Sequence, residues 1–217
     1  MARKTKEEAI ATRNGLIDAA EVVFLEKGVS RASLGDIAQA AGASRGAIYW
    51  HFRDKVDLFN AMMERVCLPL EQGSNAFDSS PCPDPVQRLR AVMALVLSMV
   101  SSDQRTRRVF EIALYRVEYV TELAGVRERH VAASEAFTSQ LACDFEVAAR
   151  MQGIELPMTA MEAAIGLHAL FNGLMQSWIL NEGAFDLVRV GRVSTDAYLS
   201  GLGLSLPPVS AEIEGAR

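Results

Sequence analysis

Apolar residues recur along most of the chain at the three- and four-residue spacing of an amphipathic α-helix. The alternation of apolar and polar residues that half-buried strands require is missing. We therefore expect an all-helical fold. The pattern predicts a first helix that ends near Lys27, with Ile10, Ile17, Ala20 and Phe24 on its inner face.

A pair of short helices is predicted next. Ser33 and Asp36 form a capping box, the sequence pattern of a helix N-terminus. Gly42 can end this helix because glycine enters the left-handed conformation at no steric cost. A second helix follows at Ser44–His51, and its first residue can cap it. Two short helices joined by a glycine turn are the pattern of a helix-turn-helix.

The second of these helices carries the chemistry. Ile48 and Phe52 lie four residues apart, on a face that can dock on a small core. Arg45, Tyr49 and His51 point elsewhere and present a guanidinium, a phenol and an imidazole. These groups suit phosphate oxygens and base edges. We interpret this helix as a recognition helix and the protein as a DNA-binding regulator.

A longer helix is predicted to begin at about residue 55. Asp54 and Asp57 repeat the capping pattern, and Lys55 lies in the first turn. Because a helix start offers N–H groups and a positive dipole, Lys55 is predicted to clamp a phosphate there. Pro69 is expected to kink or end the helix. Residues 73–85, rich in Ser, Pro and Gly, are expected to form a loop.

These stretches resemble a known family. The opening run ARKTKEEAIATRNGLIDAA and the run RGAIYWHFRDK resemble the TetR family of repressors, in particular the AcrR/TtgR multidrug-efflux repressor subgroup. The resemblance implies an N-terminal three-helix helix-turn-helix DNA-binding domain at residues 1–55. A linking helix would join it to a C-terminal helical ligand-binding and dimerisation domain at residues 56–217. It also implies that the last two helices, roughly residues 160–202, form the dimer interface.

The resemblance assigns roles to single positions. The family positions that touch phosphates match Tyr49, His51 and Lys55, and those nearest base edges match Ser44, Arg45 and Gly46. The position of Trp50 usually packs inside. Residues 2–6 are a basic arm, either a solvated terminus or a DNA contact. The full predicted DNA-binding set is Lys4, Lys6, Ser33, Ser44, Arg45, Gly46, Tyr49, His51 and Lys55.

Helical spacing continues through the rest of the chain. Further helices are predicted at 86–100, from residue 105, at 121–152, at 158–181 and at 190–202. For the helix that opens near Arg105, the inner stripe is expected at Phe110, Leu114 and Val117. The 158–181 helix is apolar nearly all round, so one side can face its own core and the other a second subunit.

Methionines and aromatic residues on several of these helices either only pack the core or also line a pocket for an apolar ligand. The residues that match family pocket positions, with Met175 beside them, are Val66, Val92, Met93, Val96, Phe110, Leu114, Phe137, Leu141, His168, Phe171, Asn172 and Met175. Phe110, Leu114 and Phe137 stand where smaller or polar residues are common in the efflux subgroup. This departure predicts a smaller or more apolar pocket.

Charge divides the 217-residue chain. The net charge is −5, yet all the lysines fall within the first 60 residues, which carry one positive charge more than negative. The remainder is acidic. A near-neutral DNA reader must depend on a few placed contacts and on dimerisation, because it lacks a generally basic surface.

Other classes of protein are less well supported. The start lacks the apolar core of a signal peptide, and the most apolar run is about half a membrane span, so we expect a cytoplasmic protein without a membrane partner. The three cysteines lack metal spacing, and either all are reduced thiols or Cys82 senses oxidants. No Gly-rich phosphate loop, metal cluster or nucleophile elbow occurs, so we expect neither an enzyme nor a cofactor or metal.

The combined prediction is a homodimeric repressor that binds a palindromic operator in double-stranded DNA. Small apolar compounds would release it, and an efflux-pump operon would be its target. The alternatives are a regulator of another operon, metabolic or lipid-related, and a helical small-molecule-binding enzyme.

Overall fold

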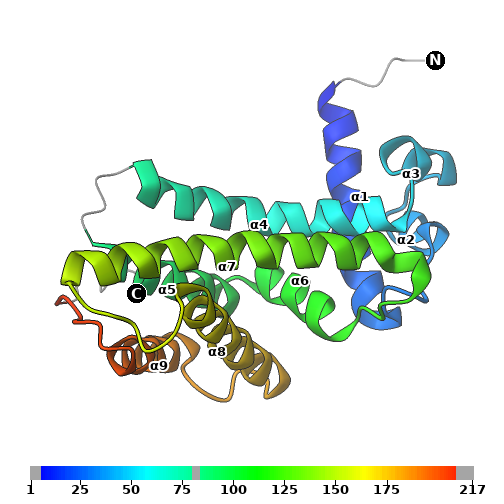
Figure 1. The fold of residues 1–217 in the computed structure, drawn as a ribbon. Coiled ribbons are helices and arrows are strands. Elements are labelled where there is room, and N and C mark those ends of the chain that lie inside the picture. Colours follow the sequence, from blue (N-terminus) through cyan, green and yellow to red (C-terminus); the bar gives the residue numbers. More distant parts are fainter. Residues whose placement is uncertain (1–5, 80–83, 209–217) are drawn as a thin grey trace. The chain divides into compact units, whose positions relative to one another are not determined.

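The computed structural model describes residues 6–79 and 84–208, and within them it contains nine α-helices, one short 3-10 helix and no strand (Figure 1). The all-helical prediction is confirmed. The helices are α1 (Lys6–Lys27), α2 (Leu34–Ala40), α3 (Arg45–His51), α4 (Lys55–Ser79), α5 (Pro85–Ser102), α6 (Gln104–Tyr115), η1 (Thr121–Leu123), α7 (Ala124–Gln152), α8 (Ala160–Leu180) and α9 (Leu187–Gly201).

The described residues fall into two compact units. Unit 1 contains those within 1–69 and 104–132, and unit 2 contains those within 70–103 and 133–217. Helices α4 and α7 contribute residues to both units, whereas α6 belongs to unit 1 with α1, α2 and α3. The domain boundary predicted between residues 55 and 56 stays a prediction.

Local capping builds the helix-turn-helix as predicted. The Ser33 hydroxyl accepts a hydrogen bond from the Asp36 N–H at 3.1 Å, and the Asp36 carboxylate accepts one from the Ser33 N–H at 3.0 Å. Gly42, with φ of +64°, turns the chain after α2. The Ser44 hydroxyl then accepts from the Ala47 N–H at 3.1 Å and starts α3.

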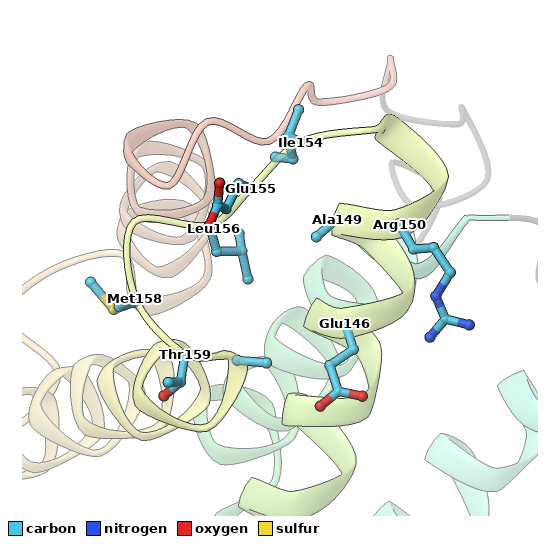
Figure 2. A pocket seen from close by; sticks show the side chains of 9 residues that line it. Glu146, Ala149, Arg150, Ile154, Glu155, Leu156, Met158 and Thr159 are labelled. Carbon is cyan, nitrogen blue, oxygen red and sulfur yellow. The ribbon is translucent and has the colours of Figure 1, made fainter.

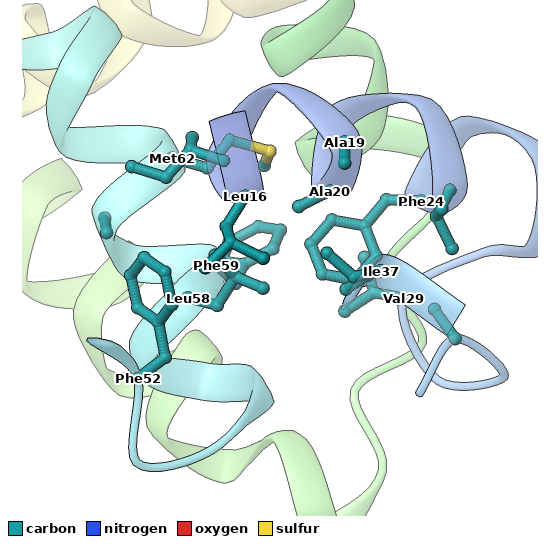
Figure 3. Close-up of a cluster of buried hydrophobic side chains, with 14 of the residues drawn as sticks. Leu16, Ala19, Ala20, Phe24, Val29, Ile37, Phe52, Leu58, Phe59 and Met62 are labelled. Atoms are coloured by element: carbon teal, nitrogen blue, oxygen red, sulfur yellow. The ribbon is translucent and has the colours of Figure 1, made fainter. Parts of the chain in front are cut away.

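A single apolar cluster holds unit 1 together (Figure 3). Phe24 of α1, Ile37 of α2, Ile48 of α3 and Leu58 of α4 are fully buried in it. The same cluster takes in residues of α6, of η1 and of the α7 start, namely Val109, Ile112, Ala113, Leu123 and Val126. Ile10 is 52% exposed and does not belong to the inner face of α1, because the buried part of that helix begins only at Leu16.

Predictions about α6 and α4 were also wrong. The buried stripe of α6 is Thr106, Val109, Ile112 and Ala113, one residue earlier than the predicted stripe. Apolar residues occupy several neighbouring positions there, so two stripes overlap in the sequence, and packing against α1 selects one of them.

Helix α4 continues through Pro69 and ends at Ser79, so residues 73–79 are helical and not part of a loop. Proline removes one backbone hydrogen bond, which the other turns of a 25-residue helix can tolerate. Residues 80–83, with Cys82, lie outside the described residues.

Unit 2 is built around α5, whose buried residues include Val86, Leu89, Val92, Met93, Val96, Leu97 and Val100. Helix α5 packs against α9 and α8, and α8 packs against α9. Arg90 of α5 forms an ion pair with Asp196 of α9 at 2.7 Å, and Arg88 pairs with the buried Asp144 of α7. By length and composition α8 could cross a membrane, but core helices of soluble proteins pass the same test.

Candidate nucleic-acid interface

The α3 surface is divided as the sequence predicts at Ile48, Arg45 and Tyr49, whereas His51 is half-buried. Ile48 is fully buried and anchors the helix to the core of unit 1, while Arg45 and Tyr49 project into solvent. Gly46 is also exposed on the first turn, so the backbone can be approached closely there. In Figure 1 α3 lies beside α1 and α2, and α3 packs against both of them. The arrangement can present a guanidinium and a phenol to DNA.

Trp50 does not pack inside, which corrects the expectation drawn from the family resemblance. The side chain is 73% exposed, and its ring meets that of His51 edge-on at 4.5 Å between centroids. Because Trp50 follows Ile48 by two residues, it lies about 200° round the helix from the buried face. A helix of seven residues has one face to bury, and Ile48 with Phe52 takes it.

Lys55 is placed where its ammonium is already bound. Its Nζ donates to the carbonyl oxygens of Ser30 at 2.7 Å and Ala32 at 3.1 Å, and it lies 3.3 Å from a carboxylate oxygen of Glu122. The residue is only 9% exposed. These three partners use all the hydrogens of the ammonium, so a phosphate contact would have to displace one of them. The DNA contact predicted for Lys55 stays a prediction, and this geometry disfavours it.

The remaining predicted contacts are spread over the same unit. Lys6 is exposed at the start of α1, and Lys4 lies outside the described residues. Ser33 and Ser44 are exposed, but their hydroxyls already cap α2 and α3. Arg53 is not in the predicted set. It directly follows Phe52, the C-cap of α3, and its side chain is 86% exposed. Its position in a turn after a buried aromatic residue was the available signal.

Asp36, the acid of the α2 capping box, forms an ion pair and hydrogen bonds with neighbouring residues. The Lys27 ammonium, at 2.8 Å, and then the hydroxyl and N–H of Ser33 lower the pKa of Asp36 to about 2. Asp36 therefore stays a carboxylate at neutral pH, and it serves the capping box of α2.

The predicted ligand residues are buried or half-buried, but they belong to different units. Val66, Phe110 and Leu114 fall in unit 1, and the other nine fall in unit 2. Within unit 2 the rings of Phe137 and His168 meet at 5.3 Å, and His168 Nδ1 lies 3.3 Å from the Thr138 hydroxyl. The pocket itself stays a prediction.

Two surface hollows, each of about 570 Å³, are lined by other residues. One lies between the end of α7 and the start of α8, with Glu146, Arg150 and Met158 among its lining residues (Figure 2). The other lies between α1 and the turn at Gly42 and is lined mostly by small side chains. Within the described part of the chain, no group of three or more His, Cys, Asp or Glu residues could hold a metal.

Comparisons with known proteins agree with this architecture. Residues 16–62 match the model of the bacterial regulatory proteins of the tetR family, and residues 84–203 match the C-terminal region of MAATS-type transcriptional repressors. The transcriptional regulator TtgR of Pseudomonas putida is 33% identical over 94% of this chain and 98% of its own.

Two solved structures are similar over nearly the whole chain. SmeT, the repressor of the Stenotrophomonas maltophilia efflux pump SmeDEF, superposes in its complex with triclosan with a TM-score of 0.78 at 33% identity, over 92% of this chain and 96% of SmeT. NalD, the secondary repressor of the MexAB-OprM pump of Pseudomonas aeruginosa, gives 0.73 at 34%, over 89% and 95% of the two chains. These relatives are transcriptional regulators and not enzymes. The chain therefore belongs to the tetR family of bacterial regulatory proteins.

Proposed function

We propose that this protein is a ligand-responsive repressor that binds a palindromic operator as a homodimer and controls an efflux-pump operon. The observation that carries the proposal is the division of α3. One face, with Ile48, is fully buried, and the other offers Arg45 and Tyr49 to solvent on a helix fixed by its own cap. A recognition helix needs this rigid mounting because side-chain contacts to base edges are directional.

A dimer is part of the proposal because one seven-residue helix offers few base contacts. Helix α8 leaves Met161, Ile165 and Leu180 exposed, and α9 leaves Val193 exposed. Large apolar side chains on two neighbouring helices are typical of a surface covered by a second subunit. The two-fold pairing of α8 and α9 would bring two α3 helices to a palindrome.

The effector is proposed to be a small apolar compound. SmeT binds triclosan in its solved complex, and NalD and SmeT repress multidrug efflux pumps. In this chain, Met93 and Met175 supply adaptable apolar side chains in unit 2, and Phe171 supplies a buried aromatic ring. The ligand would bind the state that cannot hold DNA more tightly, by about 1–3 kcal/mol for a useful switch. The protein would act in the cytoplasm, where the operator is.

The test is fluorescence anisotropy with labelled DNA from the region flanking the protein's own gene, with and without triclosan and other apolar compounds. Specific binding that a compound releases supports the whole proposal. Arg45→Ala should weaken binding and relax sequence preference, whereas Tyr49→Ala should weaken all DNA about equally. Arg150→Ala, at the end of α7, is the matched control and should bind normally. Absence of specific binding by the unaltered protein would refute the repressor function.

A further inference from the structure

The cation nearest the end of the recognition helix is not the one that the family pattern assigns to DNA. Lys55 is 9% exposed, and its ammonium donates to two backbone carbonyls, those of Ser30 and Ala32. Those carbonyls belong to the turn between α1 and α2. An ammonium has three hydrogens, and the two carbonyls and the Glu122 carboxylate, 3.3 Å from Nζ, occupy all three, so a phosphate would have to displace one of these partners. All three donors of the ammonium are therefore occupied within unit 1.

Arg53, two residues earlier, has the opposite arrangement. Its side chain is 86% exposed, while its backbone N–H donates to the Asp57 carboxylate at 3.1 Å. The Asp57 N–H in turn donates to the Asp54 carboxylate at 2.8 Å, which caps the start of α4. The backbone of Arg53 is thus anchored while its guanidinium remains in solvent. A side chain mounted in this way can bind an external anion without rearrangement of the turn.

The guanidinium has a weak internal partner that a phosphate can replace. Arg53 Nε lies 3.6 Å from the Asp57 carboxylate, and the Arg53 side chain of this pair is largely in water. An exposed ion pair of this kind contributes little, because solvent screens it. A phosphate offers two oxygens to the planar guanidinium, and this paired geometry is the stronger interaction.

The position of Arg53 fits a contact with the DNA backbone. Phe52 closes α3, its N–H donating to the Ile48 carbonyl at 2.9 Å, and its side chain is buried. Arg53 therefore leaves the protein surface directly at the C-terminal end of the recognition helix. A helix in the major groove has phosphates on both sides, and residues near its end reach the backbone before they reach bases.

We propose that Arg53 is a phosphate-binding residue of the DNA interface, and that Lys55 is a positioning residue that fixes the start of α4 on the α1–α2 turn. This inference rests on the proposed DNA-binding function. It adds a contact that the sequence pattern leaves out, and it moves Lys55 from the DNA surface to the interior.

Salt dependence separates the two roles. Each phosphate contact to duplex DNA adds about 0.9 to the slope of log affinity against log salt concentration. Full-length protein is titrated by fluorescence anisotropy at several KCl concentrations, on its operator fragment and on unrelated duplex DNA. In Arg53→Gln the slope should become shallower by about 0.9 per protomer, or about 1.8 for a dimer. Between 50 and 200 mM salt, the variant should then lose about tenfold less affinity than the unaltered protein.

Matched variants complete the test. Arg53→Lys keeps the charge and should restore the slope, and Arg150→Gln, which removes a charge from the last turn of α7, should leave it unchanged. Lys55→Met should bind more weakly with an unaltered slope and should melt earlier. An unaltered slope in Arg53→Gln, or a shallower slope in Lys55→Met with an unaltered melting temperature, overturns the inference. Failure of the unaltered protein to prefer its operator refutes only the proposed function, because unrelated DNA still reports the Arg53 slope.

Discussion

Replacing Lys55 by methionine tests how the start of α4 is held. Methionine keeps an apolar stem of similar length and removes the ammonium that donates to Ser30 at 2.7 Å and to Ala32 at 3.1 Å. Hydrogen bonds from a charged donor contribute about 1.5–3 kcal/mol each, part of which is offset because the variant no longer desolvates an ammonium. We expect a loss of about 2–4 kcal/mol in the free energy of unfolding.

The third partner of the ammonium supplies the control. Glu122 lies 3.3 Å from Lys55 Nζ, but its side chain is 70% exposed. An exposed carboxylate of this kind contributes about 0–1 kcal/mol, so Glu122→Gln should cost much less than Lys55→Met. The structure thus predicts that the two carbonyls, and not the ion pair, account for most of the stabilisation.

Urea unfolding followed by far-ultraviolet circular dichroism measures both variants. For a chain of this size, a loss of about 2–4 kcal/mol corresponds to a melting temperature lower by about 5–15 °C. A Lys55→Met variant within about 0.5 kcal/mol of the unaltered protein would show that the carbonyls do not depend on the ammonium. Equal losses in the two variants would instead make the ion pair the main interaction.

Three further changes test other parts of unit 1. Gly42→Ala should lower the free energy of unfolding by about 1–2 kcal/mol, because alanine resists the φ of +64° there, and Gly42→Asn should cost less. The pKa of Asp36 is about 2, below its usual 3.8. Its carboxylate therefore stabilises the fold fully at pH values above 3.8, and this stabilisation is lost as the pH falls towards 2. The difference in urea midpoint between the unaltered protein and Asp36→Asn should therefore be constant above about pH 5 and shrink between pH 4 and 2. Trp50→Phe should remove most of the emission that acrylamide quenches, because Trp50 is exposed and the tryptophan of α8 is buried; equal quenching in both proteins would contradict the exposed placement.

The sequence predicted well what short-range interactions decide. The caps at Ser33 and Ser44 and the turn at Gly42 involve residues no more than five positions apart. Their geometry follows from backbone requirements that any helix start or end must meet. Burial of Ile48 and Phe52 also followed from spacing alone, since a short helix has a single face to dock.

Features decided by distant parts of the chain were not predictable in the same way. Lys55 lies at a helix start, where sequence reasoning favours a phosphate contact. Its ammonium turns inward because the α1–α2 turn presents two carbonyls and because η1, more than sixty residues later, presents Glu122. Likewise the stripe that α6 buries depends on where α1 lies, and the sequence contains two overlapping candidates.

Because of these long-range contacts, the helices of the helix-turn-helix cannot be treated as independent of α6. Val109 and Ile112 of α6 are fully buried in the cluster that holds α1, α2 and α3. Ion pairs join the same helices: Asp18 of α1 pairs with Arg65 of α4 at 2.8 Å and with Arg105 of α6 at 2.9 Å.

The turn between α1 and α2 is hydrogen-bonded to the residues that follow the end of α6. The Val29 N–H donates to the Arg116 carbonyl at 2.9 Å, and the Ser30 hydroxyl donates to the Glu118 carboxylate at 3.0 Å. Lys55 binds that turn from the side of α4. A close-packed core and shared hydrogen bonds move as a body, because separating them leaves voids and unpaired groups. A ligand that displaced either α4 or α6 within unit 1 would therefore displace the turn that leads into α2 and α3, so the proposed release of DNA needs no dedicated hinge in the helix-turn-helix itself.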